Sequence, residues 1–202
     1  MVDWDGTVTE HDTLRRLFPR FGHPEVTAEA AGRLGRGLTL RELLTLQFST
    51  VRVPRDEVVD WVLAEAVIRR GFAAFVERYR PRIVSSGFHE LIEPILAREG
   101  IEVELEANRV EPDPGGWRVR WRHETSCEIC GETCKRSLLP PGPVVYVGDG
   151  YSDHCAALVA DRVFATSGLA EYFDARGLPY EPFTDFVALE RSLGANPPGI
   201  LL

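Results

Sequence analysis

Residues 1–12 read MVDWDGTVTEHD and place two carboxylates, Asp3 and Asp5, one residue apart after an apolar start. Side chains two positions apart on an extended strand share a face, so these two like charges would occupy the same space. Such a pair repels unless a cation or a shared proton relieves the repulsion. An Mg²⁺ held by carboxylate and carbonyl oxygens meets that need. Gly6 and Thr7 follow and predict a turn directly after the carboxylates.

Three later segments also place polar residues beside an apolar run. Residues 83–88 read IVSSGF, and residues 144–153 read VVYVGDGYSD. Between them stands Lys135, the only lysine in a chain whose other strongly basic residues are arginines. A lysine retained in such a sequence indicates a need for a compact ammonium group, although a solvated lysine at a helix start is the alternative.

The spacing of apolar residues predicts a helical segment followed by alternating strands and helices. Helices are predicted over 11–22, 24–36, 40–49, 54–63 and 72–79, and later over 88–98, 151–160, 168–176 and 183–193. Strands are predicted over 82–85, 101–107, 144–147 and 162–164, with a hairpin over 108–122. Thr39 and Glu42 have the spacing of a capping box, and Pro54 is expected in the first turn of its helix.

This order predicts an α/β fold with a parallel sheet and helices on both of its faces. We expect residues 1–11 and 80–202 to form that core, and residues 12–79 to form an all-helical insertion. In such sheets ligands bind at the carboxyl ends of the strands, where the polar residues of 1–12, 83–88 and 144–153 would meet.

The composition excludes several classes of function. Hydrophobic residues make up 44% and charged residues 27% of the 202 positions, as in ordinary globular chains. We expect no membrane span, because no apolar run approaches 18 residues, and no signal peptide, because acidic residues begin at position 3. The net charge of −8 disfavours a nucleic-acid partner. Four cysteines do not form a secreted disulfide framework, so we predict a cytoplasmic location.

The start of the chain is unusual, because only Met1 and Val2 precede Asp3, whereas strands usually have about five or six residues. Either the first strand is very short or the native chain starts upstream. We hypothesise an upstream start, and an intact mass of the native protein that matches Met1 as first residue would contradict it.

The four segments, in this order and spacing, resemble the motifs of the haloacid dehalogenase (HAD) superfamily of phosphatases. The resemblance covers nearly the whole chain. It implies a Rossmann-like core, with residues 12–79 as the small cap of the phosphoserine-phosphatase-like branch. It also implies Mg²⁺-dependent hydrolysis of a small phosphorylated metabolite through an aspartyl-phosphate.

The resemblance assigns a role to each carboxylate. Asp3 would be the nucleophile and Asp5 the general acid–base, and Asp5 favours phosphoryl transfer because dehalogenases of this superfamily lack it. Both would also belong to the metal site, together with Asp149 and Asp153. The alternative for Asp153 is an acidic residue favoured in the first turn of a helix.

The phosphate would be held by residues of three segments, namely Thr7, Ser85, Ser86, Gly87 and Lys135. Ser85 matches the hydroxyl of the second motif, and the backbone N–H groups of Ser86 and Gly87 would lie at a helix N-terminus, a natural anion site. We expect Thr7 to brace the loop and Ser86 to cap the helix. The alternative for Ser85 is a plain helix cap.

Asp12 stands where phosphoserine phosphatases carry a Glu that meets the substrate amine, although helix capping is an equal alternative for it. Residues 134–137 (CKRS) and the segments 169–173 (LAEYF), 177–180 (GLPY) and 182–186 (PFTDF) resemble the methionine-salvage branch. Phosphoserine and phospho-amino-alcohol substrates stay open. An alternative of another class is a non-catalytic metabolite-binding or zinc-dependent interaction module on the same fold. The oligomeric state is not predicted.

A cysteine cluster directly precedes Lys135. Cys127, Cys130 and Cys134 have a C-x2-C-x3-C spacing that suits Zn²⁺. The fourth ligand would be Cys155, His123 or His154. Reduced, packed thiols are the alternative.

Overall fold

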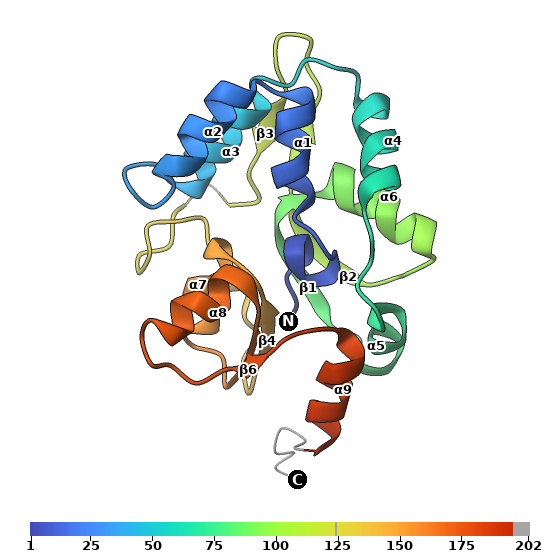
Figure 1. Ribbon diagram of the computed structural model, residues 1–202, viewed down its shortest axis with the longest axis vertical. Coiled ribbons are helices and arrows are strands. Elements are labelled where there is room, and N and C mark those ends of the chain that lie inside the picture. Colours follow the sequence, from blue (N-terminus) through green and yellow to red (C-terminus); the bar gives the residue numbers. More distant parts are fainter. Residues whose placement is uncertain (124, 196–202) are drawn as a thin grey trace.

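A parallel sheet forms the centre of the protein, and Val2 joins its two halves. The computed structural model describes residues 1–123 and 125–195. Val2 pairs in parallel with Ile83 on one side and with Val147 on the other, so the strand order is β3-β2-β1-Val2-β4-β5-β6. The strands are β1 (Arg82–Phe88), β2 (Glu104–Glu111), β3 (Arg118–Arg120), β4 (Val145–Gly148), β5 (Arg162–Ala165) and β6 (Glu181–Pro182). The N-terminus therefore lies between β1 and β4 (Figure 1).

Helices cover both faces of this sheet, as the alternation along β5 shows. Phe164 belongs to the larger buried cluster, while its neighbours Val163 and Ala165 belong to a smaller, separate one. Successive side chains of a strand point to opposite faces, so each face has its own core. The larger core receives α6 (His89–Glu99) and α9 (Phe186–Ala195), and the smaller receives α7 (His154–Ala157) and α8 (Ser167–Asp174). The predicted α/β fold class is confirmed.

Five helices connect the first and second motifs, as predicted. They are α1 (Thr13–Phe21), α2 (Pro24–Arg33), α3 (Leu40–Phe48), α4 (Arg55–Glu65) and α5 (Phe72–Tyr79). The capping box of Thr39 and Glu42 is confirmed at the start of α3. Pro54 precedes α4 as its N-cap and is not in its first turn. Helices α1, α2 and α3 gather at the end of the molecule away from α9 (Figure 1).

The division into a core and a cap over residues 12–79 stays a prediction. Helix α5 belongs to that range, yet it packs against α9 of the core. Phe72 contacts Phe186 with ring centroids 4.9 Å apart and meets Trp4 edge-on. Across the described ranges, no helix is long and apolar enough to cross a membrane.

Several element boundaries differ from prediction, and the short strand β6 was not predicted. Strand β1 continues to Phe88, and β2 starts later than expected and runs from its parallel pairing with β1 into the hairpin with β3. The helix predicted over 151–160 is a 3₁₀ turn, Tyr151–Asp153, followed by the short α7. This segment is irregular because the Asp153 carboxylate accepts the N–H groups of Asp149 and Gly150, which competes with a regular helix start.

Candidate active site

The loop after Val2 brings Asp3 and Asp5 to the carboxyl edge of the sheet. Residues Trp4–Val8 form a single π-type turn, and Gly6 adopts a left-handed conformation with φ 77°. A Cβ at Gly6 would lie 2.4 Å from Asp149 Oδ2. Glycine is therefore required here both by the backbone angle and by the approach of the fourth motif.

Arg69 holds this loop from outside. Its Nε donates to the carbonyl of Thr7 at 2.8 Å, and its Nη2 donates to the carbonyls of Gly6 and Thr9 at 2.8 and 3.4 Å. A further Nη1 bond reaches Thr184 at 3.1 Å. The guanidinium fork satisfies carbonyls that the irregular loop leaves unpaired. No periodicity or motif marked this residue in the sequence.

Lys135 lies at the floor of the site and is completely buried. Its ammonium group forms an ion pair with Asp3 and a second one, at 2.7 Å, with Asp153. Burial opposes the charged form of Lys135, but the two carboxylates outweigh burial and raise its pKa. Lys135 is thus a permanent positive charge beside Asp3, which excludes the alternative of a solvated surface lysine.

Asp153 has all of its acceptor positions occupied. Oδ1 accepts from Lys135 Nζ and from the Tyr146 hydroxyl, both at 2.7 Å. Oδ2 accepts from the N–H groups of Asp149 and Gly150, both at 3.0 Å. An ionised carboxylate offers about four such positions, so Asp153 braces Lys135 and the Asp149 backbone. Tyr146 was missed in the sequence, although a tyrosine in the buried run VVYVG signals a hydroxyl that needs a partner.

Asp3 and Asp149 form a group able to hold a cation, with the fully hydrogen-bonded Asp153 carboxylate beside them. Their nearest carboxylate oxygens all lie within 4.8 Å of one another. Burial, with the charges of Asp3 and Asp153, raises the pKa of Asp149 to about 9. Burial also raises the pKa of Asp3, to about 6, against the opposing effect of Lys135. Crowded carboxylates of this kind fit Mg²⁺, which prefers oxygen ligands.

Asp5 interacts with a different segment, the start of α1. Its Oδ1 accepts the N–H of Thr13 at 3.0 Å and also the Thr13 hydroxyl. Burial and the charge of Asp12 raise the pKa of Asp5 to about 8. The carboxylate cluster does not include the Asp5 side chain. Among the predicted roles, this position suits a proton donor better than a metal ligand.

The second motif lies at the end of β1. Ser85 is buried, and its Oγ accepts the N–H of Gly87 at 2.8 Å. The Ser86 hydroxyl is buried and has no partner within the part of the chain that the structure describes. Ser86 does not cap a helix, because α6 begins only at His89 with Phe88 as its N-cap. Ser85, Ser86 and Gly87 instead line a cavity as the end of an extended strand.

Two residues that were not predicted brace this strand end. Arg122 Nη1 donates to the carbonyl of Ser85 at 2.6 Å, and Asn108 Nδ2 donates to the carbonyl of Ser86 at 2.9 Å. Asn108 also accepts the N–H of Arg122 at 3.2 Å. Asn is unfavourable inside a strand, and this was the only signal in the sequence that pointed to either residue.

Thr7 and Asp12 take structural positions. The Thr7 hydroxyl is buried and directed at Asp149 Oδ1 at 3.5 Å, so it braces the fourth motif. Asp12 is the N-cap of α1 and accepts the N–H of Arg15 at 2.9 Å. Asp12 also lines the cavity, so capping and substrate contact are compatible for this side chain.

A cavity of about 590 Å³ lies between the carboxylates and serines of the sheet edge and the helices α1, α2 and α3. Its polar floor includes Asp3, Asp5, Ser85, Ser86 and Asp149. Its opposite wall comes from α1, α2 and α3 and is mainly apolar, with Leu14, Phe18, Ala28, Ala31, Leu34, Leu40, Leu43 and Leu44. A ligand with an anionic end and an apolar end fits this distribution.

Comparison with known proteins agrees with the motifs. Residues 1–158 match the family model described as haloacid dehalogenase-like hydrolase. The chain belongs to this family. The family and the hydrolase class predicted from the four motifs are confirmed.

The curated relatives of this HAD hydrolase include the 2-hydroxy-3-keto-5-methylthiopentenyl-1-phosphate phosphatase of Geobacillus thermodenitrificans (strain NG80-2). It is 31% identical over 197 residues, which cover 91% of this chain and 90% of the relative. This agrees with the predicted resemblance to the methionine-salvage branch.

Solved structures give the fold. The chain superposes on a "Phospho-Aspartyl Intermediate Analogue of Phosphoserine phosphatase" with a TM-score of 0.71, 17% identity and coverage of 95% and 96% of the two chains. A phosphoserine phosphatase from T. onnurineus gives a TM-score of 0.67 at 19% identity, over 95% and 92% of the chains. At these identities the likeness supports the fold class alone.

Proposed function

We propose that this HAD hydrolase cleaves the phosphomonoester of a small metabolite through an aspartyl-phosphate on Asp3. The observation that carries the proposal is the buried ion pair of Lys135 with Asp3 at the floor of a cavity. An oxygen of Asp3 attacks phosphorus, and the bond from phosphorus to the leaving oxygen breaks. Lys135 balances the negative charge of both the nucleophile and the phosphoryl group.

Asp5 supplies and then removes a proton. With a pKa of about 8, its carboxyl group holds a proton at neutral pH and donates it to the leaving oxygen. The resulting carboxylate then takes a proton from water as that water attacks the aspartyl-phosphate. This step releases inorganic phosphate, frees Asp3 and returns the proton to Asp5.

The Mg²⁺ site and the phosphate contacts complete the proposal. Asp3 and Asp149 would hold the ion, with Asp153 fixing Asp149 from behind, and the bound ion would offset charge on the phosphoryl oxygens. Ser86 offers its unpartnered hydroxyl to one of those oxygens. Ser85 and the backbone of Gly87 line the same part of the cavity.

For the substrate we favour a phosphate ester with a neutral, apolar tail, such as the methylthiopentenyl phosphate named in the relatives. The wall opposite Asp3 is formed mainly by leucine, alanine and phenylalanine side chains. Burial of a methylthio group against this wall makes the free energy of binding more favourable. A phosphoserine or phospho-amino-alcohol substrate is the second candidate, because Asp12 also lines the cavity and would meet an amine.

Phosphate release from a panel of phosphorylated metabolites tests this proposal. The panel compares methylthioalkyl and plain alkyl phosphates with phosphoserine and phosphoethanolamine, each with Mg²⁺ and with EDTA. We expect Mg²⁺-dependent release that is fastest for apolar tails and falls at least 10³-fold in Asp3→Asn. Asp56→Asn, on the exposed surface of α4, is the matched control and should keep full activity.

Two outcomes of this panel would count against parts of the proposal. Fastest release from phosphoserine would reject the apolar-tail preference and favour the second candidate. No release from any compound by folded protein would favour the non-catalytic binding module.

A cytoplasmic location is part of the proposal too, because free thiols are typical of a reducing compartment.

A further inference from the structure

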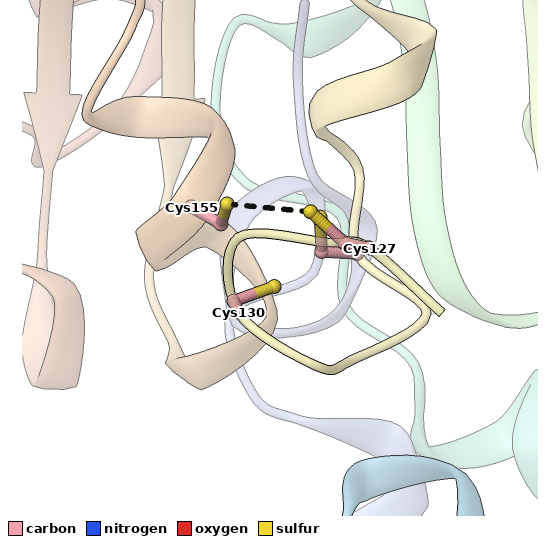
Figure 2. Close-up of side chains that lie close together, drawn as sticks. Cys127, Cys130 and Cys155 are labelled. Atoms are coloured by element: carbon pink, nitrogen blue, oxygen red, sulfur yellow. Dashed lines mark hydrogen bonds between the residues drawn. The ribbon is translucent and has the colours of Figure 1, made fainter. Parts of the chain in front are cut away.

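Four cysteine sulfurs meet outside the catalytic cavity. Cys127, Cys130 and Cys134 come from the segment before Lys135, while Cys155 comes from α7. The four sulfur atoms all lie within 4.8 Å of one another. Figure 2 shows Cys127 and Cys130 on one loop and Cys155 on the neighbouring helix, with the Cys127 and Cys155 sulfurs 3.9 Å apart. None of these residues lines the cavity that contains Asp3.

The backbone around Cys127 has a conformation that suits chelation. The N–H of Gly131 donates to the carbonyl of Cys127 at 2.8 Å, and Gly131 has φ 72°. This turn brings Cys130 back beside Cys127. Cys127 and Cys130 are accessible and Cys134 and Cys155 are buried, so an ion has a path into the cluster.

Packing does not account for this segment. Ile129, at the tip of the turn, is 72% exposed. Between β3 and the 3₁₀ turn Arg136–Leu138, no helix or strand is found among the described residues. Short irregular segments without a core of their own usually need a metal or a disulfide. No disulfide joins these cysteines in the described part of the chain, and four cysteine sulfurs at this separation match the ligand set of a closed zinc site.

We propose that Cys127, Cys130, Cys134 and Cys155 bind one Zn²⁺ as a structural tetrathiolate site. The fold selects Cys155 among the three candidates for fourth ligand, because neither His123 nor His154 belongs to the cluster. The His154 ring stacks instead on Tyr172, with centroids 3.8 Å apart. Four protein ligands leave no open position, so the ion has no direct part in phosphate hydrolysis.

The site connects two segments that the reaction needs. Cys134 directly precedes Lys135, and Cys155 follows Asp153 by two residues. Lys135 and Asp153 form the buried ion pair that supports Asp3. Zinc would therefore hold the third and fourth motifs at a fixed separation. Because one cysteine ligand adjoins Lys135 and another lies close to Asp153 in the chain, the zinc site would restrain the Lys135–Asp153 ion pair from both of its segments.

Metal content of the reduced wild-type protein is the first test. Protein purified without chelators should contain close to one Zn²⁺ per chain by elemental analysis. After removal of zinc under reducing conditions, Co²⁺ titration should give the intense visible absorption of tetrahedral thiolate coordination at one equivalent. Absence of both signals in folded wild-type protein would overturn the proposal. So would a Cys127–Cys155 disulfide in protein kept under anaerobic conditions.

Variants identify the ligands. Cys155→Ser should lower zinc occupancy and weaken Co²⁺ binding at least 10-fold, and Cys130→Ser, at the exposed position, should do the same with less risk to folding. His154→Gln is the matched control beside Cys155 and should keep one zinc. Retention of full occupancy in both cysteine variants, or loss only in His154→Gln, would contradict the assigned ligand set.

Discussion

At the scale of single residues, the site gives two neighbouring aspartates, Asp3 and Asp5, different environments. Asp3 and Asp5 stand one residue apart, yet Asp3 forms an ion pair with Lys135 whereas Asp5 accepts hydrogen bonds from Thr13 and lies near Asp12. Lys135 limits the rise in the pKa of Asp3 to about 6, so Asp3 is largely charged at neutral pH, whereas the pKa of Asp5 rises to about 8 and Asp5 stays protonated. Environment, and not residue type, therefore divides the two roles.

Asp5→Asn tests the role of proton donor. With alkyl phosphates, whose alkoxides are poor leaving groups, we expect kcat to fall about 10²–10⁴-fold. With p-nitrophenyl phosphate, the rate of phosphoryl transfer to Asp3 should fall much less in this variant, because the p-nitrophenolate group leaves without protonation. In the wild-type enzyme the alkyl-phosphate rate should decline above about pH 8, where Asp5 loses its proton.

Asp12→Asn is the comparison variant, because Asn also caps helices well. It should leave the dependence on the leaving group unchanged. The rate of the phosphorylation step is measured in single-turnover experiments with both types of ester. If Asp5→Asn lowers this rate equally for alkyl phosphates and for p-nitrophenyl phosphate, Asp5 is not the acid.

At the scale of elements, the loop Trp4–Val8 depends on an arginine from a distant segment. Arg69 lies after α4, about sixty residues along the chain, and bonds the carbonyls of Gly6 and Thr7. The loop has no helix or strand ladder of its own to satisfy these carbonyls. Its conformation, and with it the direction of Asp3 and Asp5, is thus fixed from outside.

Arg69→Met should lower kcat about 10²-fold with a smaller change in KM, because misplacement of reacting groups by about 1 Å has effects of this size. Steady-state kinetics with the best substrate measure the change. Arg70→Met is the matched control: Arg70 is next in sequence, 69% exposed, and pairs only with Asp185 in the salt bridges of the described chain. If both variants keep wild-type kcat, the loop does not need Arg69.

At the scale of the whole molecule, the crowded carboxylates link folding to pH and to Mg²⁺. Burial and mutual repulsion raise the pKa values of Asp3, Asp5 and Asp149 to about 6, 8 and 9. The folded, metal-free protein therefore holds protons that the unfolded chain releases from about pH 4 upward. Stability then falls as pH rises through this window, because the folded state binds more protons.

Thermal unfolding in EDTA should show Tm decreasing from about pH 5 to pH 9. Mg²⁺ binds the ionised carboxylates of the folded state, so the gain in Tm on adding Mg²⁺ should increase with pH. Asp149→Asn should remove most of that gain and flatten the decline in EDTA. A gain in Tm that is independent of pH, or equal in Asp149→Asn, would show that the ion binds elsewhere.

The sequence by itself indicated the family, through the resemblance of its four motifs to the HAD superfamily, and it predicted most of the helices and strands from local periodicity, although not β6. Asp3, Ser85, Lys135 and Asp149 were predicted as site residues from their motifs, and the structure brings Asp3 close to both Lys135 and Asp149. The sequence misplaced the end of β1 and the helix after Asp149, where side chains bond the backbone instead of following periodicity.

Only the tertiary structure decided which distant groups meet. It brought Arg69 to the loop of Asp3, Tyr146 to Asp153, and Cys155 to the three other thiols. It also placed an apolar wall from α1, α2 and α3 opposite the carboxylates. These contacts join residues far apart in the chain, and their partners are chosen by packing of the whole sheet and its helices, which no local pattern encodes.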